Sequence, residues 1–381
     1  MKDPDSGHII VVAGEPSGDV HAASLVREIK RMNPYLSFYG IGGEELAACG
    51  VDLFYHIRDL SAMGVTEVVL QIRNIHQAFF LYKKKLKSIS PDLVILVDYP
   101  GFNLKAAEHA KKYSIRVLYY ISPKIWAWKS GRIKKIKKFV DHTSLVLPFE
   151  ERIYRRASVP ATFVGHPLLD TCPEIHQKTE SEKETGKTVI GLLPGSRASE
   201  IHQHLELMLK AAGSIRENCP DTTFLLSCAS SVDFEEMSRM VEKYNRDGLF
   251  RIVQGPPETI FQQSDLLIAA SGTVTLEAAI FAVPMIIVYR MSRLSYAIAR
   301  RFVKVQYAGL ANIIAGREIV PELIQEDARV DTIVDKVLHL MEEDHLYRMR
   351  QELLTIRSML GGKGASRRTA NIAFEMAAGK L

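Results

Sequence analysis

Hydrophobic residues along the chain gather in short, nearly continuous runs that are separated by amphipathic stretches. In the first half, such runs predict strands at residues 8–13, 37–41, 91–98, 116–122 and 144–147. Between them, stretches such as residues 20–31 repeat apolar positions every three to four residues, as one face of a helix does. Apolar strands that alternate with helices are typical of a parallel sheet covered by helices on both faces. The pattern therefore predicts an α/β fold.

The alternation stops at residues 171–187, where the sequence is polar and charged, and we interpret this stretch as a linker. It then begins again, with strands expected at residues 188–193, 223–229, 250–253, 265–270 and 284–289. Residues 329–360 have a helical pattern, Gly361 and Gly362 interrupt it, and a last helix is expected at residues 365–378. The prediction is two α/β domains, residues 1–170 and 188–360, and a C-terminal helix in residues 361–381 that packs back on an N-terminal domain.

Length and composition narrow the class of protein. A chain of 381 residues suits about two domains, and 47% hydrophobic with 24% charged residues excludes a disordered or collagen-like chain. No apolar run approaches the roughly 18 residues of a membrane span. The run at residues 9–13 is too short for a signal peptide, so we expect a cytoplasmic protein. Four cysteines without C-x-x-C spacing indicate reduced thiols rather than a disulfide or zinc framework.

Ligands of open α/β sheets bind beyond the carboxyl ends of the strands, so the loops that follow strands are the candidate sites. The first such loop contains Gly14, Glu15, Ser17, Gly18 and Asp19. Its glycines allow a tight turn and close approach of the backbone. The spacing is not G-x-G-x-x-G, so a dinucleotide site is not indicated. Either Ser17 or Asp19 caps the next helix, or the loop faces a substrate.

A carboxylate ends the next apolar run, at Asp98, and a turn with Gly101 and Asn103 follows it. In that position a carboxylate either caps the following helix or accepts a proton from an alcohol nucleophile. The sequence leaves open whether His21 or His56 assists it.

Two loops in the second half suit a diphosphate. Gly195 and Ser196 begin a helix after a predicted strand, where backbone N–H groups and the helix dipole attract anions. Arg197 adds a guanidinium that can hold a phosphate by two hydrogen bonds, or else forms a salt bridge between the domains.

The other loop contains Ser271, Gly272 and Thr273, and it also begins a helix. Glu277 lies one turn further on, where its carboxylate either accepts both ribose hydroxyls of a nucleotide or is simply solvated. We therefore expect the second half to hold a nucleotide diphosphate and the first half to hold an acceptor and the base. The residues expected at the acceptor are Glu15, Ser17, Gly18, Asp19 and Asn103.

No acidic D-x-D pair follows a strand where a magnesium–diphosphate would bind, so we expect no cofactor and no obligatory metal. The nearby His202 and His204 are expected on a helix surface rather than at a metal.

Basic residues gather at residues 129–138 and at Lys83, Lys84, Lys85 and Lys87, although the net charge is only 49 − 44 = +5. No nucleic-acid motif accompanies them, so an anionic membrane surface is a better partner than nucleic acid. The predicted helix at residues 61–75 is either buried or a membrane patch, through apolar residues that include Met63, Val65, Val68, Val69 and Ile72.

Seven stretches of the chain, in order, resemble those of the lipid-A-disaccharide synthase family. They are AGEPSGD (13–19), VDYPGFN (97–103), SPKIWAW (122–128), LPFE (147–150), LLPGSR (192–197), ASGTVTLE (270–277) and NIIAGRE (312–318). The resemblance implies the GT-B fold, in which two Rossmann-like domains face each other across a cleft. Two departures are Gly101, where some relatives carry a second acid, and Ala311, where relatives carry proline.

The resemblance also implies an activity: transfer of 2,3-diacylglucosamine from UDP to the 6-hydroxyl of 2,3-diacylglucosamine 1-phosphate, with inversion. It makes Asp98 the essential acid and Arg197 the residue that holds the donor phosphate. Glu277 and Asn312 would bind the nucleotide, and we add Gln325 beside them. The expected partners are acylated glucosamines, the cytoplasmic face of the inner membrane of a Gram-negative bacterium, and a second copy that exchanges C-terminal segments.

Two other functions remain open at this point. One is a different GT-B enzyme, either a UDP-N-acetylglucosamine 2-epimerase or a glycosyltransferase with a soluble or undecaprenyl-linked acceptor. The other is a nucleotide-sugar sensor without catalytic activity, which would bind UDP and turn nothing over.

Overall fold

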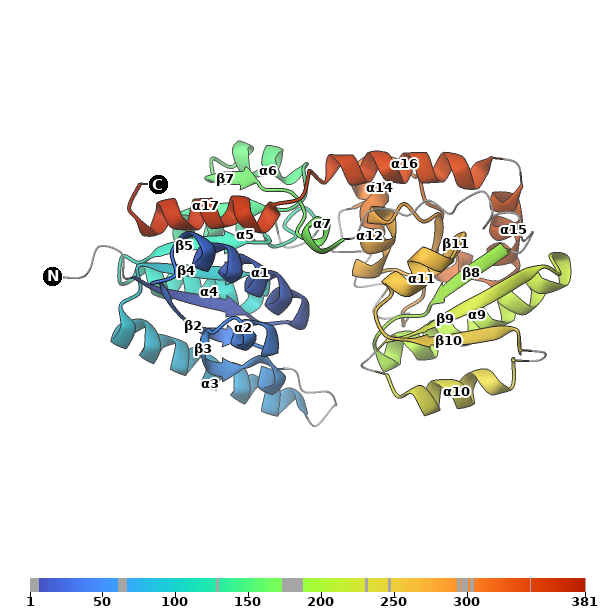
Figure 1. Cartoon of the computed structure of the whole chain (residues 1–381), viewed down its shortest axis with the longest axis horizontal. Coiled ribbons are helices and arrows are strands. Elements are labelled where there is room, and N and C mark those ends of the chain that lie inside the picture. Colours follow the sequence, from blue (N-terminus) through green and yellow to red (C-terminus); the bar gives the residue numbers. More distant parts are fainter. Residues whose placement is uncertain are drawn as a thin grey trace. The chain divides into compact units, whose positions relative to one another are not determined.

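The chain is described by a computed structural model that covers residues 7–60, 67–127, 130–172, 188–229, 232–245, 248–292, 296, 301, 305–342 and 344–380, with the side chains of 67–71 left out. It divides into two compact units, and Figure 1 shows their elements. The first unit comprises Met1–Thr171 with Leu360–Leu381, and the second comprises Cys172–Met359.

The first unit is built on a parallel sheet of seven strands in the order β3-β2-β1-β4-β5-β6-β7. The strands are β1 (His8–Ala13), β2 (Ser37–Gly42), β3 (Asp52–His56), β4 (Leu93–Val97), β5 (Arg116–Tyr120), β6 (His142–Leu145) and β7 (Ala161–Phe163). The helices are α1 (Pro16–Met32), α2 (Glu44–Ala48), α3 (Glu67–Ile89), α4 (Pro100–Lys111), α5 (Arg132–Phe139), α6 (Glu150–Arg156), α7 (Leu168–Thr171) and α17 (Ala365–Ala377).

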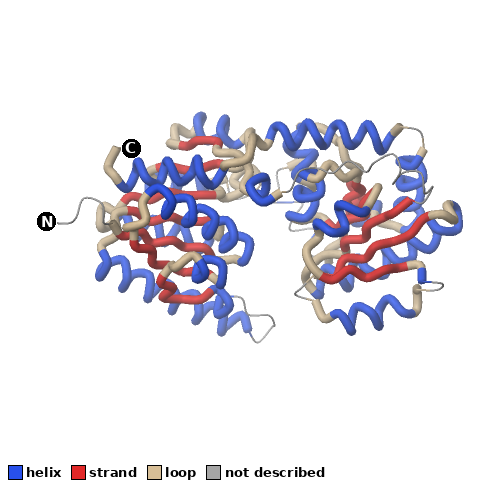
Figure 2. Tube along the Cα trace, in the orientation of Figure 1, coloured by secondary structure: helices blue, strands red, loops and turns tan. Residues whose placement is uncertain are grey.

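The central strands of this sheet are apolar throughout because helices cover both faces (Figure 2). Successive side chains of a strand point to opposite faces. Ile10 and Val12 of β1, with Val94 and Leu96 of β4, therefore share one core with residues of α3, α4 and α5. On the other side, α1 and α17 pack against each other and against strands of the sheet.

The second unit has a parallel sheet of six strands in the order β10-β9-β8-β11-β12-β13. The strands are β8 (Thr188–Leu193), β9 (Thr222–Cys228), β10 (Phe250–Gln254), β11 (Leu266–Ala270), β12 (Met285–Tyr289) and β13 (Glu322–Ile324). The helices are α9 (Ala198–Asn218), α10 (Phe234–Glu242), α11 (Glu258–Gln263), α12 (Thr273–Ile280), α14 (Leu310–Ala315), α15 (Val330–Met341) and α16 (His345–Met359). The predicted α/β fold with two parallel sheets is thus confirmed.

The strand order of each sheet reverses at one point: between β1 and β4 in the first unit and between β8 and β11 in the second. Ligands of such sheets bind at this switch point, beyond the carboxyl ends of the two strands. The four loops that the sequence singled out directly follow these four strands. Each unit therefore brings two candidate loops together at its switch point.

The C-terminal segment belongs to the first unit within the same chain. Asp170 caps α17, since its carboxylate accepts hydrogen bonds from the backbone N–H groups of Gly364 (2.6 Å), Ala365 (3.1 Å) and Ser366 (2.9 Å). Exchange of this segment between two copies stays a prediction. The predicted linker falls mostly on residues 173–187, which lie outside the described residues.

Candidate active site

Asp98 occupies a strained turn directly after β4. Its φ is 45°, and the next residue, Tyr99, has a φ of 44°. Residues other than glycine rarely adopt this left-handed region, and they persist there only where the surrounding structure enforces it. Strain of this kind is concentrated at functional sites, so the turn itself marks Asp98 as a candidate.

Two buried side chains hold this turn in place. Asn103, in the first turns of α4, donates from Nδ2 to the carbonyl oxygens of Asp98 (2.7 Å) and Val97 (3.0 Å). The hydroxyl of Tyr119 on β5 donates to the same Asp98 carbonyl (2.6 Å). Asn103 is fully buried, so the structure gives it a positioning role beneath Asp98 in place of the acceptor contact that we expected.

The Asp98 carboxyl is partly buried, and this burial raises its pKa to about 6. The negative charge of Glu15, at the start of α1, raises the pKa further. The positive charges of Lys124 and Arg132 lower it. A carboxylate with a pKa near neutrality is a stronger base than an ordinary aspartate and is still ionised at neutral pH, as a general base requires.

Gly14 is required by the aromatic ring beside Asp98. A Cβ atom at this position would lie 2.1 Å from the Tyr99 ring. Glu15 and Ser17 are exposed at the start of α1, where they remain available to a ligand. Gly18 is different, because a Cβ atom there would make only ordinary contacts of 3.8 Å or more.

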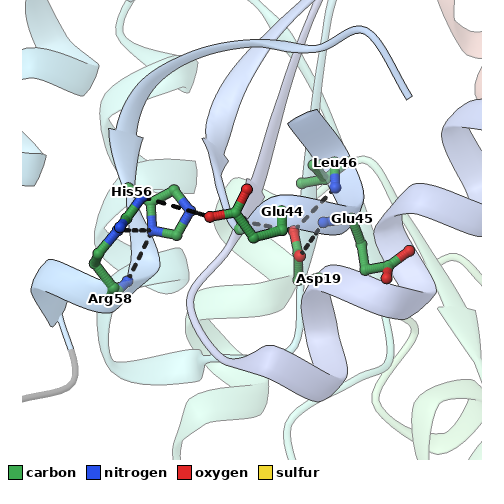
Figure 3. Close-up of polar contacts among 7 residues, drawn as sticks. Asp19, Glu44, Glu45, Leu46, His56 and Arg58 are labelled. Carbon is green, nitrogen blue, oxygen red and sulfur yellow. Dashed lines mark hydrogen bonds and ion pairs between the residues drawn. The ribbon is translucent and has the colours of Figure 1, made fainter. Parts of the chain in front are cut away.

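Asp19 has a structural role in place of the acceptor contact that we expected. Its buried carboxylate accepts hydrogen bonds from the backbone N–H groups of Gly43 (2.7 Å) and Glu45 (3.0 Å), and so it caps the short helix α2 (Figure 3). It caps this distant helix rather than the helix that carries it, which is why the local sequence could not show the contact.

The structure gives no assisting role to the two histidines considered beside Asp98. His56 Nε2 lies 3.3 Å from a Glu44 carboxylate oxygen, and its Nδ1 accepts from the backbone N–H of Arg58 at 3.1 Å (Figure 3). Burial lowers the pKa of His21 to about 4, although the charge of Asp170 opposes this shift. His21 is therefore neutral at physiological pH.

A buried acid, Glu150, was missed by the sequence reasoning. Its carboxylate accepts from the Ser122 hydroxyl (2.8 Å), the Trp126 indole N–H (3.1 Å) and the backbone N–H of Leu147 (3.2 Å). These bonds tie the loop after β5 to the loop after β6, and the first of these loops carries Lys124. Glu150 thereby fixes the loop whose lysine acts on Asp98.

In the second unit, the loop after β8 presents a compact set of anion donors, and a carboxylate of the chain already occupies them. Glu200 Oε2 accepts from the backbone N–H groups of Ser196 (3.1 Å) and Arg197 (3.4 Å), and its Oε1 accepts from Arg197 Nη1 (3.0 Å). Gly195 has a φ of +120°, and a Cβ atom there would collide with Glu200. The Arg197 side chain is 74% exposed, so its guanidinium can reach a ligand.

The loop after β11 leads into α12, where Gly272 and Thr273 are exposed. Glu277 lies one turn along this helix. Burial raises its pKa to about 7, and the nearby charge of Glu258 on α11 adds to this shift. Burial makes the ionised form of this carboxyl group unfavourable, and hydrogen bonds donated by a ligand would stabilise that form. The two hydroxyls of a ribose can donate such bonds.

Two predicted donor-binding side chains are used inside the unit instead. Asn312 is fully buried, donates to the Val320 carbonyl (2.7 Å) and accepts from the Ile319 N–H (2.8 Å). The Gln325 amide accepts from the backbone N–H of Met291 (2.8 Å) and donates to its carbonyl (3.2 Å). Through these bonds the two side chains shape the neighbouring loops. Their part in binding a nucleotide stays a prediction.

His204 was expected on a helix surface, and this prediction was wrong. It is fully buried, its Nδ1 lies 3.1 Å from the Pro194 carbonyl, and its Nε2 accepts from the backbone N–H of Arg290 (2.9 Å). The ring thus joins the loop after β8 to the loop after β12. Burial lowers its pKa, so it is neutral in this role.

Two further expectations concern metals and membranes. No cluster of three or more histidine, cysteine or acidic side chains that could hold a metal occurs among the described residues. Across the same part of the chain, no helix has the length and apolar character needed to cross a bilayer. Of the predicted membrane patch, Met63 and Val65 and the side chains of Val68 and Val69 lie outside the described residues, and Ile72 is 53% exposed on α3.

Comparison with solved structures supports the fold. A putative UDP-N-acetylglucosamine 2-epimerase from Listeria monocytogenes has a TM-score of 0.65 and 12% identity, with 99% of this chain and 98% of that chain covered. MurG from Acinetobacter baumannii has a TM-score of 0.62 and 13% identity, with 97% and 99% covered. At such low identity the likeness shows the GT-B fold alone.

Comparison by sequence identifies a family as well as a fold. Residues 9–375 match the family described as lipid-A-disaccharide synthetase. The lipid-A-disaccharide synthase of Geobacter sulfurreducens is 39% identical over 381 residues, with 99% of each chain covered. That of Syntrophus aciditrophicus is 41% identical over 373 residues, with 97% of each chain covered. The chain therefore belongs to the lipid-A-disaccharide synthase family, the GT-B glycosyltransferases of lipid A biosynthesis.

Proposed function

We propose that the first unit binds 2,3-diacylglucosamine 1-phosphate and that the second unit binds UDP-2,3-diacylglucosamine. The acceptor 6-hydroxyl oxygen forms a bond to the anomeric carbon of the donor sugar, while the bond from that carbon to UDP breaks. Attack from the face opposite UDP inverts the anomeric centre. The products are the tetraacyl disaccharide 1-phosphate and UDP.

Asp98 is the general base in this proposal and takes the proton of the 6-hydroxyl as the oxygen attacks. The observation that carries the assignment is its carboxyl group, held in a strained turn at the end of β4 with its pKa raised to about 6. General-base help of this kind is typically worth about 10²–10⁴-fold in rate.

The second unit stabilises the leaving group. Arg197 and the backbone N–H groups at the starts of α9 and α12 would hold the diphosphate, where negative charge grows as UDP departs. Glu277 would accept hydrogen bonds from the ribose hydroxyls. The Glu200 carboxylate must release the backbone N–H groups of Ser196 and Arg197 if the diphosphate is to accept hydrogen bonds from them.

A transfer assay tests the function directly. Purified protein is mixed with UDP-2,3-diacylglucosamine and 2,3-diacylglucosamine 1-phosphate in detergent micelles that contain EDTA, and mass spectrometry follows the disaccharide 1-phosphate. We expect product in EDTA, because guanidinium and backbone N–H groups take the diphosphate without a metal. Product that forms only after magnesium is added would refute the metal-free mechanism. No product in either condition, with UDP still bound, would favour another acceptor or the sensor function.

The pH dependence of the reaction should report on Asp98. With donor saturating, we expect kcat/KM for the acceptor to rise as pH increases through about 6 and then level off, because only the ionised carboxylate accepts a proton. Glu277→Gln is the matched control: it should weaken donor binding and keep the inflection near pH 6. A profile that is flat from pH 5 to 8 would contradict the assignment of the base.

We also propose that the first unit contacts the cytoplasmic face of the inner membrane through α3. Ile72 and Phe80 lie eight residues apart on one face of this helix and are 53% and 62% exposed. The lysines of the same helix, Lys83, Lys84, Lys85 and Lys87, follow them. Apolar side chains beside basic ones are typical of a helix that lies on an anionic bilayer.

A vesicle experiment tests this surface. The double substitution Ile72→Ser and Phe80→Ser should weaken binding to phosphatidylglycerol-containing vesicles at least roughly tenfold, since each buried apolar side chain contributes about 1.5–3 kcal/mol. Tyr35→Ser with Tyr113→Ser is the matched control, because both tyrosines are exposed but lie off α3. Equal vesicle binding by the two double variants and the native protein would count against the proposal.

A further inference from the structure

A pocket of about 380 Å³ lies beside the Asp98 turn in the first unit. The first turns of α4 and α5 form its walls, with Gly101 and Leu104 on one side and Gly131 on the other. A Cβ atom at either glycine would meet no atom within 4 Å, so there is open space in front of the backbone. The proposed mechanism leaves this pocket without a role.

Three cations line the pocket: Lys105 on α4, and Arg132 and Lys135 on α5. No acidic side chain is among its described lining residues. Lys111, further along α4, has an acidic partner, because its ammonium lies 2.8 Å from an Asp141 carboxylate oxygen. For Lys105 and Lys135, the described part of the chain provides no such carboxylate partner.

The pocket adjoins the proposed base. Arg132, which lines it, is close enough for its positive charge to lower the pKa of Asp98. Lys105 lies seven residues after Asp98, and α4 begins directly after the Asp98–Tyr99 turn. A small ligand that reaches Asp98 at one end can therefore place an anionic group among these cations at the other.

We propose that this pocket binds the phosphate monoester of the acceptor, an inference that rests on the proposed function. A phosphate monoester carries a charge of about −1.5 to −2 near pH 7 and presents three acceptor oxygens, which suits a pocket lined by three cations. With the phosphate at C1 fixed here, the 6-hydroxyl, which C5 carries on the far side of the ring oxygen from C1, is directed to Asp98. The pocket thus selects a phosphorylated acceptor and sets which hydroxyl reacts.

The test compares two acceptors, 2,3-diacylglucosamine 1-phosphate and the same sugar with a free 1-hydroxyl. For the native protein we expect a much higher kcat/KM with the phosphorylated acceptor. The double substitution Lys105→Ala and Lys135→Ala should raise KM for this acceptor at least roughly tenfold, because a hydrogen bond to a charged group is worth about a factor of ten or more. It should leave kcat/KM for the free 1-hydroxyl sugar within about threefold, so the ratio between the acceptors collapses.

Arg132 stays in place in this experiment because its charge acts on Asp98. The matched control is Lys112→Ala with Lys134→Ala, which removes the same charge from the end of α4 and from α5 at exposed positions outside the pocket. The control should keep the native ratio between the two acceptors. Both variants should unfold at the native temperature, since all four lysines are exposed.

A lipid headgroup is a second source of phosphate, and binding to phosphatidylglycerol vesicles distinguishes it. If the Lys105/Lys135 variant keeps the native acceptor ratio, the inference is wrong, and a loss of vesicle binding alongside would assign these lysines to the bilayer. If the native protein forms no disaccharide, the proposed function fails and this inference fails with it. Product with a native ratio in the variant overturns the inference alone.

Discussion

Replacing Asp98 by asparagine is expected to lower turnover by about 10²–10⁴-fold while leaving UDP affinity unchanged. The amide cannot take the proton of the acceptor hydroxyl, and the nucleotide is assigned to the other unit. Asparagine tolerates the left-handed φ of 45° better than most residues, so the turn should be kept. Transfer rates at saturating substrates and UDP binding by calorimetry measure the two effects.

The unfolding temperature of the Asp98→Asn variant distinguishes loss of the base from a folding defect. The pKa of Asp98 in the folded protein is about 6, above its ordinary value of 3.8, so the ionised form is disfavoured by folding. This penalty is absent below pH 3.8, grows as pH rises from 3.8 to about 6, and stays constant above pH 6. The asparagine variant should therefore unfold at the native temperature or higher at pH 7.5. Asp52→Asn, at an exposed carboxylate of the same unit, is the matched control and should keep full activity. Full activity of Asp98→Asn would refute the assignment of the base.

Replacing Arg197 by alanine is expected to weaken UDP binding about 10- to 100-fold and to lower turnover by at least as much. The guanidinium would contribute charge-assisted hydrogen bonds to the diphosphate, each worth about 1.5–3 kcal/mol. Turnover falls as well because charge on the leaving group grows in the transition state. Arg197→Lys should recover binding only in part, since an ammonium lacks the planar pair of donors.

The fold should not suffer from this change. Arg197 is largely exposed, and surface ion pairs such as that with Glu200 contribute little to stability. Arg239→Ala on α10 is the matched control, since this arginine is exposed in the same unit and belongs to neither the loop after β8 nor the loop after β11. Native UDP affinity in Arg197→Ala, at an unchanged unfolding temperature, would remove Arg197 from the donor site.

The contacts of the buried polar side chains near the site were not predicted from the sequence. Asn103 and Asp19 were expected at a ligand, yet each bonds to backbone groups inside the unit. His204 was expected at the surface, yet it joins two loops at the carboxyl edge of the second sheet. The local pattern of apolar and polar residues does not show which backbone groups these side chains bond to. A polar residue in a loop that follows a strand can therefore stabilise the loop rather than bind the ligand.

The sequence by itself determined the class of fold, most strands and the four loops at the switch points. Buried parallel strands must be apolar throughout, and helices between them must have one apolar face, so both leave a periodic pattern. It did not show β3, β7 and β13, which are short strands at sheet edges, because partial exposure there removes the need for a continuous apolar run.

Only the tertiary structure decided how side chains are used at those loops. It set the strained turn of Asp98, the burial that raises the pKa of its carboxyl, and the cations of α4 and α5 that share one pocket beside it. Each of these properties depends on groups brought together from separate elements, and on the water that packing excludes. A linear pattern records the type of each residue, while desolvation and the electric field at a site follow from its neighbours in space.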